Sequence, residues 1–384
     1  MHDFPEEPQF IDTEAGLAEL CEQLRGQPVL ALDTEFLREK TYYAQLCLLQ
    51  VAAEGVIACV DPLAVDLHPL LEIIYDPQVV KVMHSARQDM EIFFDLRDDV
   101  PRPLFDTQIA ATLMGFGEQV GYANLVQQML GVTLDKVATR TDWSQRPLDA
   151  EQISYAADDV RYLFTVYHQQ VELLASKGRL DWLQADFDEM SDRSTYAPSP
   201  DDLWKRVRGA KKLSSPQLAV LRGLAIWREE RAQASNRPRR WILKDEVMLD
   251  LAKRSPVNLE NLKKIRGIEE RMLSRHGDAI LKVIAAAKAT DPNHWPTPTK
   301  NRRLAPEQDA VVDLLMAVLR LRGNENEVSP SLLASRKQLE ALVAGEGDVP
   351  VLHGWRAELA GHDLQAVLAG EKSVRVVDGA LVVG

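Results

Sequence analysis

Residues 28–35 read PVLALDTE, and this stretch decides which fold we expect. The apolar run from Pro28 to Thr34 is typical of a buried strand. Alternate residues of a strand face the same side, so the carboxyl groups of Asp33 and Glu35 point to one place. Two close carboxylates repel each other, and an all-oxygen pair favours Mg²⁺ or Mn²⁺ as its cation over zinc. An exposed strand end with two solvated acids remains the alternative.

Further strands and helices surround this stretch in a mixed order. Ser85 is the candidate N-cap of one of the helices. Strands interleaved with helices predict an α/β N-terminal domain with a mixed sheet flanked by helices. The strand patterns cover residues 43–52, 55–60, 79–84 and 104–106, and the helical patterns cover 67–75, 85–95, 107–114, 122–130 and 150–172.

The stretch 191–202, SDRSTYAPSPDD, breaks the helical pattern and is the best candidate for a linker. Helical patterns, among them those over 330–344 and 351–360, dominate the chain beyond it, and a second, proline-rich linker at 291–306 interrupts them. The two helical stretches resemble each other at a spacing of 90 to 92 residues, which indicates one duplication of a small helical unit. Two unrelated amphipathic bundles are the alternative. We expect three domains, at 1–200, 205–292 and 300–375, of which the last two are all-α helical bundles.

Composition excludes several classes of protein. With 46% hydrophobic and 27% charged residues, the 384-residue chain can bury a core, which excludes global disorder and fibrous folds. The three cysteines form no CxxC pair, so a thiolate zinc site is not expected and a reducing compartment fits. No apolar run spans a bilayer, and the acidic first residues differ from a signal peptide. We therefore expect a cytoplasmic monomer with no membrane partner.

The net charge of −13 conceals an asymmetry along the chain. Residues 1–200 carry 14 Lys and Arg against 34 Asp and Glu, a net charge of −20. Residues 201–275 carry 19 against 10, a net charge of +9. An acidic module followed by a basic one suggests that the first holds cations and the second holds polyanions. Uneven surface decoration is the alternative.

Further carboxylates occur at Asp89, in a predicted helix start, and in Tyr155-Ala-Ala-Asp-Asp159. Residues i and i+4 share a helix face, so Tyr155 and Asp159 are neighbours and Asp158 points away. Each motif alone has a structural explanation, because acids are favoured in a first helical turn and tyrosines are often half-buried. Together with Asp33 and Glu35, they suit a two-metal site for phosphoryl transfer.

In order and spacing, Asp33-x-Glu35, Asp89 and Tyr155-x3-Asp159 resemble the DEDD exonucleases with a tyrosine in the third motif. Over residues 8–190 the chain resembles the ribonuclease D family, through TYYAQLCLLQVA (41–52), FDTQIA (105–110), GVTLDK (131–136), RTDWSQRPL (140–148) and YAADDVRYL (155–163). The stretch from Trp227 to Pro256 resembles an HRDC domain. The second helical copy, from about residue 300, is more diverged and has Leu319-Arg320 where the first has a Trp–Arg pair.

The resemblance implies a ribonuclease H-like exonuclease fold and a metal-dependent 3′→5′ exoribonuclease that trims tRNA precursors and other structured RNAs with a single-stranded 3′ end. It implies two divalent ions, Mg²⁺ or Mn²⁺. By this analogy Asp33, Glu35 and Asp159 hold one ion, Asp33 also bridges to a second ion near Asp89, and Tyr155 orients or deprotonates the attacking water. The released products would be nucleoside 5′-monophosphates.

Two further groups of residues are candidates for contact with RNA. Contacts with the terminal nucleotides are expected from His84, Gln45, Lys136 and Trp143. A lone histidine such as His84 more often has a structural role, and for Trp143 a structural role explains the residue equally well. In the basic module, cations beside an aromatic side chain suit phosphates and an unpaired base; they are Lys211, Lys212, Arg237, Arg239, Arg240 and Trp241. A solvated basic face is the alternative there. A DNA exonuclease and a non-catalytic RNA-binding adaptor remain alternatives for the whole chain.

Overall fold

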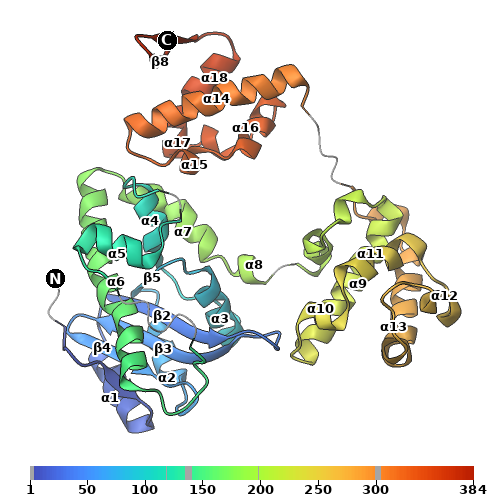
Figure 1. The fold of residues 1–384 in the computed structure, drawn as a ribbon, viewed down its shortest axis with the longest axis horizontal. Coiled ribbons are helices and arrows are strands. Elements are labelled where there is room, and N and C mark those ends of the chain that lie inside the picture. Colours follow the sequence, from blue (N-terminus) through green and yellow to red (C-terminus); the bar gives the residue numbers. More distant parts are fainter. Residues whose placement is uncertain (1–3, 118, 135–140, 198, 299–303) are drawn as a thin grey trace.

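The computed structural model describes residues 4–117, 119–134, 141–197, 199–298 and 304–384. It contains an N-terminal domain (residues 4–190), a first helical domain (α9–α13) and a second helical domain (α14–α18), which follow one another around a ring in Figure 1. The α/β domain followed by two largely helical ones confirms the expected fold class. No helix within the described ranges is both long and apolar enough to cross a membrane.

The N-terminal domain is built on a six-stranded sheet in the order β1-β4-β3-β2-β5-β6. The strand β2 lies inside the sheet, antiparallel to β3 and parallel to β5, so the sheet is mixed as predicted. The pairing between β2 and β3 is irregular at Glu35 and Phe36. The strands are β1 (Gln9–Ile11), β2 (Val29–Leu37), β3 (Gln45–Ala53), β4 (Val56–Val60), β5 (Val80–Met83) and β6 (Leu104–Asp106).

Helices cover both faces of this sheet, and each face has its own core. Alternate β2 residues divide between the two cores: Val29 and Ala31 pack with α6, whereas Leu30 and Leu32 pack with α1, α2 and α3. The helices of the domain are α1 (Glu14–Leu24), α2 (His68–Ile74), α3 (Arg87–Arg97), α4 (Thr107–Thr112), α5 (Tyr122–Leu130), α6 (Ala150–Ser176), the 3₁₀ turn η1 (Leu180–Leu183) and α7 (Gln184–Met190).

Local capping fixes where the two helices beside β2 begin. Asp149 and Gln152 form a capping box at α6, since each side chain accepts a hydrogen bond from the other's backbone N–H at 2.8 Å. The prediction that Ser85 caps the other helix is wrong. Ser85 has φ 59°, and α3 begins at Arg87. The carboxylate of Asp106 instead accepts hydrogen bonds from the backbone N–H groups of Ser85 and Ala86, at 3.2 and 2.8 Å.

The linker predicted at 191–202 contains short helical turns, and the two helical domains follow it. Both begin with a 20-residue helix, a one-turn helix and a further helix, the order expected from a duplication. The elements are α8 (Arg193–Tyr196), η2 (Pro200–Arg206), η3 (Ala210–Lys212), α9 (Ser215–Ala234), α10 (Arg239–Ile242), α11 (Asp245–Arg254), α12 (Leu259–Lys263), α13 (Glu270–Ala289), η4 (Pro292–His294), α14 (Pro306–Glu325), α15 (Pro330–Leu333) and α16 (Arg336–Val343).

The last part of the chain differs most from the predicted pattern. The helix expected over 330–344 is broken at Ala334, which is extended, and Ser335 caps the helix that follows. The helix expected over 351–360 is replaced by short turns, and a hairpin ends the chain. These elements are η5 (Pro350–Leu352), α17 (Gly354–Arg356), the π-helical turn η6 (Ala357–Gly361), α18 (His362–Leu368), β7 (Val374–Val377) and β8 (Ala380–Val383).

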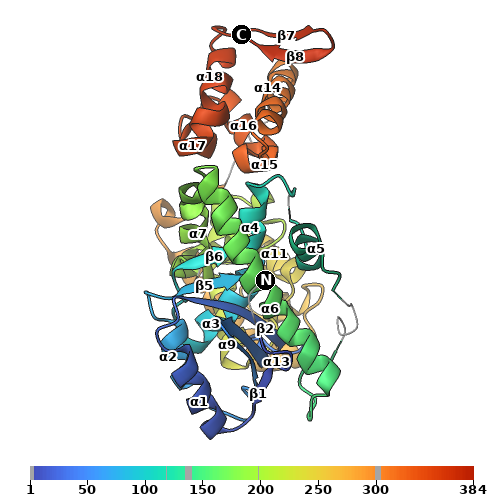
Figure 2. The ribbon, with the colours of Figure 1, turned by 90° about the vertical axis from the view of Figure 1, so that its left-hand side faces the viewer.

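The two helical domains attach to the N-terminal domain differently. The core of α14–α18 is continuous with the core under α6, whereas α9–α13 has a separate core. Trp182 of the N-terminal domain and Trp355 of the second helical domain stack on each other, with ring centroids 4.8 Å apart. Arg356 pairs with Asp186 there at 3.0 Å. Figures 1 and 2 accordingly place α15 and α17 over the α4 and α7 end of the N-terminal domain.

One arginine joins the loop before α6 to the sheet. Arg146 binds both carboxylate oxygens of Asp61, just after β4, at 2.6 and 2.7 Å. Its guanidinium also donates to the backbone carbonyls of Cys47, Trp143 and Gln145, at 2.7 to 2.8 Å. Burial alone raises the pKa of Asp61, but hydrogen bonds from Arg146 and Leu63 outweigh burial and lower it. The loop is thus fixed through a buried carboxylate.

Replacing Arg146 with methionine should therefore be costly, because it leaves the side chain of Asp61, only 5% exposed, without its partner. We expect the free energy of unfolding to fall by about 3–5 kcal/mol, as for a broken buried ion pair. Urea unfolding measures this. The matched control is Arg193→Met, whose ion pair with Asp98 is largely exposed and contributes about 1 kcal/mol or less. Equal losses in the two variants would contradict the assignment.

Candidate active site

The strand β2 presents Asp33 and Glu35 on the face covered by α6. They alternate with Thr34, which is buried on the opposite side, and follow Val29 and Ala31 on the α6 side of the sheet. The spacing of two therefore places both carboxyl groups where the sequence predicts, on one face at the end of an apolar strand.

Asp89 reaches the same region from α3, across the sheet. It lies in the first turn of α3, is 8% exposed and accepts a hydrogen bond from the hydroxyl of Thr34. The residue between the two β2 carboxylates thus fixes a third carboxylate. We did not single out Thr34 from the sequence, although strand alternation alone assigns it to the α3 side.

The helix α6 supplies Tyr155 and Asp159 from its second and third turns. Ala156, Ala157 and Val160 are fully buried against the sheet and hold this segment over β2 and β3. Asp158 instead pairs with Arg161, whose Nε lies 3.0 Å from its carboxylate. The helix therefore separates the two adjacent aspartates, with Asp159 directed to β2.

Electrostatics show that the four carboxyl groups form one cluster. Burial raises the pKa of Asp33 well above its usual range, and the charges of Asp159, Asp89 and Glu35 raise it further. Burial, followed by Asp159 and Asp89, raises the pKa of Glu35 to about 8. Burial likewise raises the pKa of Asp89 to about 6 and that of Asp159 to about 7. Each ionised group destabilises the others, so the cluster favours protons or cations.

Tyr155 belongs to the same cluster. Burial, and then the charges of Asp159, Glu35 and Asp33, raise its pKa to about 12. The ring of Trp143 lies nearly parallel to the Tyr155 ring, with centroids 6.4 Å apart. Trp143 is 4% exposed and stands in the loop that Arg146 fixes, so this loop supports the orientation of the phenol.

The donor set suits a hard divalent cation. All four groups offer carboxylate oxygens, and no Lys or Arg in the described part of the chain forms an ion pair with any of them. As they stand, no three His, Cys, Asp or Glu side chains of the described residues enclose a common ion position. Uncompensated carboxylates repel one another, which keeps these side chains apart. Their charge and their oxygen donors nevertheless suit a divalent cation, which would draw them together.

The four residues predicted to contact the terminal nucleotides differ in their exposure and in their hydrogen bonds. Gln45 is exposed at the start of β3 and free to meet a substrate, and Lys136 lies outside the described residues. Both ring nitrogens of His84 are engaged, with Thr107 at 3.0 Å and the Val120 carbonyl at 3.1 Å, and burial lowers its pKa. His84 therefore has a structural role, and Trp143, buried behind Tyr155, does as well.

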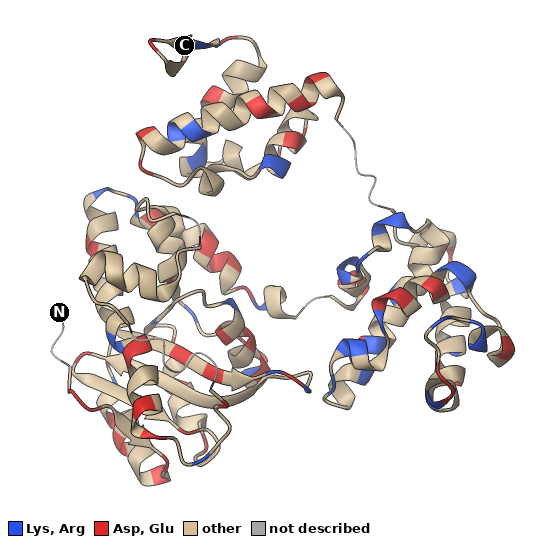
Figure 3. Cartoon of the chain, viewed as in Figure 1, with Lys and Arg blue, Asp and Glu red and all other residues tan. Residues whose placement is uncertain are grey.

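Most of the predicted basic residues lie on the surface of the first helical domain, where Figure 3 shows Lys and Arg concentrated. Trp241 is 59% exposed, which leaves its ring free for stacking. Arg239 differs from its neighbours, because it is half-buried in an ion pair with Glu229 at 2.5 Å. This pairing argues against RNA contact by Arg239. The exposed cations are Lys211, Lys212, Arg237 and Arg240.

A second tyrosine, which sequence reasoning missed, borders the site. The hydroxyl of Tyr122, on α5, donates to the backbone carbonyl of Asp158 at 3.1 Å. Burial raises the pKa of Tyr122, and the charges of Asp159 and Asp33 raise it further. Its position between Gly121 and Ala123 at a helix start gives no sequence signal for this contact.

Comparison with known proteins agrees with this geometry. Residues 8–174 match a family model described as a 3′-5′ exonuclease, and residues 217–284 match the HRDC domain. The first match contains all four carboxylates and Tyr155. The second contains the exposed Trp241 and the cations around it.

Relatives match the chain over nearly its whole length. Ribonuclease D of Gluconacetobacter diazotrophicus is 42% identical and covers 99% of this chain and 97% of its own length. Ribonuclease D of Sphingobium indicum is 41% identical, with 97% of each covered. The crystal structure of Escherichia coli RNase D, described as an exoribonuclease involved in structured RNA processing, aligns with a TM-score of 0.83 and 32% identity, over 95% of this chain and 99% of that one. With this carboxylate cluster in an exonuclease domain and an HRDC domain behind it, the chain belongs to the ribonuclease D family of 3′→5′ exoribonucleases.

Proposed function

We propose that this exoribonuclease trims the 3′ ends of tRNA precursors and other structured RNAs and releases nucleoside 5′-monophosphates with the help of two divalent ions, Mg²⁺ or Mn²⁺. One observation carries the proposal: Asp33, Glu35, Asp89 and Asp159 come from three separate elements and raise one another's affinity for positive charge. The family depends on divalent metal, and these oxygen donors suit either ion.

In this proposal Asp33, Glu35 and Asp159 hold one ion, and Asp33 and Asp89 hold the other. When bound, the ions acidify a water molecule and offset the charge on the leaving 3′ oxygen. The chain contributes by fixing the ligands before substrate arrives. The hydrogen bond from Thr34 orients the Asp89 carboxylate, and the capping box at the start of α6 fixes the position of Asp159.

Tyr155 acts on the attacking water mainly by orienting it. With a pKa of about 12, its phenol keeps its proton near neutral pH and is a poor general base. The hydroxyl can still hydrogen-bond to the water, and Trp143 restricts where the ring lies. The water is thereby aimed at the terminal phosphodiester.

The basic surface, defined here as Lys211 and Lys212 just before the HRDC domain and Arg237, Arg240 and Trp241 within it, would bind the structured part of the substrate. Its exposed cations suit phosphates, and the exposed Trp241 ring suits an unpaired base. The free, buried Cys21, Cys47 and Cys59 suit a reducing cytoplasm, and a single chain supplies the whole carboxylate cluster, as a monomer requires.

The first prediction concerns Asp33. Asp33→Asn removes a carboxylate from the centre of the cluster, and we expect hydrolysis of RNA to fall by about a thousandfold or more while RNA binding is kept. The matched control is Asp158→Asn on the same site's helix, which removes a carboxylate paired with Arg161. Nucleotide release from a short RNA, and from a DNA of the same sequence, measures both variants. Near-parental hydrolysis by Asp33→Asn would refute the assignment.

The second prediction concerns pH and stability without metal. The carboxyl groups of Glu35 and Asp159 have pKa values of about 8 and 7 in the folded chain, above their ordinary values of 4.5 and 3.8. The folded state therefore retains protons that the unfolded state releases, so stability falls as pH rises from about 4 to about 8. With a chelator present, the melting temperature of the native chain should fall as the pH rises over this range. The melting temperature of Asp33→Asn should fall less steeply.

Added Mg²⁺ should restore the melting temperature of the native chain at pH 8, because binding to the folded state alone stabilises it. The control Asp98→Asn removes an exposed carboxylate outside the cluster and should follow the native chain. A melting temperature that stays constant with pH in the chelator would contradict the clustering.

The third prediction concerns salt. Replacing Lys211, Lys212, Arg237 and Arg240 together with alanine should weaken binding of structured RNA and reduce the slope of log affinity against log salt, by about one for each phosphate that is no longer neutralised. Hydrolysis of short single strands should be kept. The control is Arg25→Ala, an exposed cation of the N-terminal domain. An unchanged slope would count against RNA binding by this surface.

A further inference from the structure

A single loop ties the catalytic domain to the HRDC domain. The loop connects β2 to β3, and Tyr42 stands in it seven residues after Glu35. In Figure 1 the tip of the β2–β3 hairpin extends out of the N-terminal domain and ends beside α10. The hairpin that supplies Asp33 and Glu35 is therefore the element that reaches the HRDC domain.

The side chain of Tyr42 is held by three HRDC residues. Its hydroxyl donates to Glu229 at 2.6 Å and accepts from Arg239 at 2.8 Å and from Gln233 at 3.1 Å. The Arg239 guanidinium also lies over the Tyr42 ring, 4.5 Å from its centroid. Hydrogen bonds to charged groups and cation–π contacts are among the stronger polar contacts in proteins.

The backbone of the loop is recognised as well. Asn236, at the end of α9, accepts hydrogen bonds from the backbone N–H groups of Tyr42 and Tyr43 with one side-chain oxygen, at 3.0 and 3.1 Å. Asn236 has φ 44°, a left-handed conformation that asparagine tolerates better than most residues. The ring of Tyr42 also packs against the core of α9–α13.

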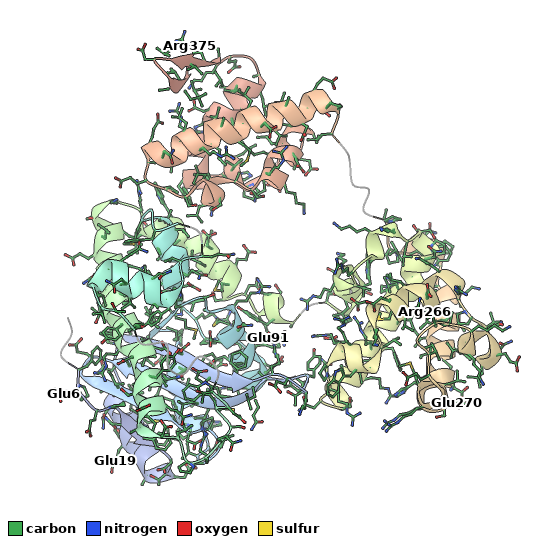
Figure 4. All side chains as sticks on the ribbon, in the orientation of Figure 1. Glu6, Glu19, Glu91, Arg266, Glu270 and Arg375 are labelled. Carbon is green, nitrogen blue, oxygen red and sulfur yellow. The ribbon has the colours of Figure 1, made fainter. Side chains whose placement is uncertain are left out.

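Away from this loop the two domains are separated. A cavity of about 820 Å³ lies between α3, the linker around Tyr196 and α9. Its walls carry charges of both signs, with Glu91 and Asp95 on α3, Glu229 and Glu230 on α9, and the arginines Arg87, Arg206 and Arg239 beside them. Figure 4 shows Glu91 on the side of α3 that faces the HRDC domain. Glu91 pairs with Arg38 and Glu229 pairs with Arg239, each within its own domain, and no ion pair of the described residues joins α3 to α9 across the cavity.

The polar contacts are accordingly concentrated on the loop. Within the described ranges, every hydrogen bond that directly joins residues 4–190 to α9–α13 ends on Tyr42 or Tyr43. The second helical domain is attached differently, through a continuous core and the Trp182–Trp355 stack. The HRDC domain is thus the part whose direct hydrogen bonds to the N-terminal domain converge on one loop, and most of them end on Tyr42.

We propose that Tyr42 is a positioning residue for the hydrolysis of structured RNA. By fixing the HRDC domain to the hairpin that carries Asp33 and Glu35, Tyr42 keeps the basic surface at a set distance from the carboxylate cluster. RNA held on that surface then presents its 3′ end to the site at high effective concentration. The inference rests on the proposed binding of structured RNA by the HRDC domain.

The test compares Tyr42→Ala with the native chain on a hairpin RNA that has a short 3′ tail and on a short single strand. We expect kcat/KM for the hairpin RNA to fall about tenfold, which corresponds to about 1.4 kcal/mol. For the short strand it should stay within about twofold. The radius of gyration in small-angle scattering should rise. The salt slope should not change, because every cation of the basic surface remains.

Three further variants complete the test. Asn236→Ala weakens the same contact from the HRDC side and should reproduce the effect in milder form. Tyr42→Phe keeps the ring and loses the hydroxyl, so it should lie between Tyr42→Ala and the native chain. Glu39→Ala alters an exposed residue of the same loop and should match the native chain.

An unchanged ratio of hairpin to short-strand activity in a folded Tyr42→Ala would overturn the inference. If the basic-surface alanine variants still lower the salt slope in that case, RNA binding by the HRDC domain survives and only the positioning role fails. If they leave the slope unchanged, both fail. If Tyr42→Ala does not fold, the same comparison is made with Tyr42→Phe and Asn236→Ala. Both variants leave the packing of the Tyr42 ring intact.

Discussion

The structure depends on one electrostatic constraint: Asp33, Glu35, Asp89 and Asp159 bring buried carboxyl groups to one region, and no Lys or Arg of the described residues forms an ion pair with them. Burial raises the pKa of each group, and the charges of the other groups raise the pKa values of Asp33 and Glu35 further, so folding without a cation retains an unfavourable interaction in the site. The surrounding structure compensates with rigid elements. Thr34 hydrogen-bonds to Asp89, a capping box starts α6, and the ion pair between Arg146 and Asp61 fixes the loop before it.

This constraint divides the work among the domains. Repelling carboxylates suit small divalent cations, but they also repel the phosphates of RNA. In the proposed function the cations for the phosphates lie elsewhere, on the HRDC domain, where Figure 3 shows Lys and Arg concentrated. Separation of the two charges requires a fixed geometry between them, and the contacts of Tyr42 provide one on the described residues.

The sequence predicts the site better than its surroundings. Alternation along PVLALDTE and the i, i+4 spacing of Tyr155 and Asp159 are local rules, and the structure follows both. The failures come from long-range contacts. Ser85 does not cap α3, because the carboxylate of Asp106 satisfies the backbone groups there. The sequence predicts Arg239 to be a surface cation. In the structure it forms an ion pair with Glu229, ten residues away in sequence, and a hydrogen bond with Tyr42 in another domain.

The stack of Trp182 on Trp355 has a consequence for synthesis of the chain. Domains usually fold in order as the chain leaves the ribosome. Here part of the core beside α6 is supplied by residues that are translated after the HRDC domain, since Leu333 and Leu339 belong to it. Until those residues emerge, the nascent N-terminal domain exposes an apolar surface around Trp182. A prematurely terminated chain keeps that surface exposed, which marks it for recognition by chaperones or proteases.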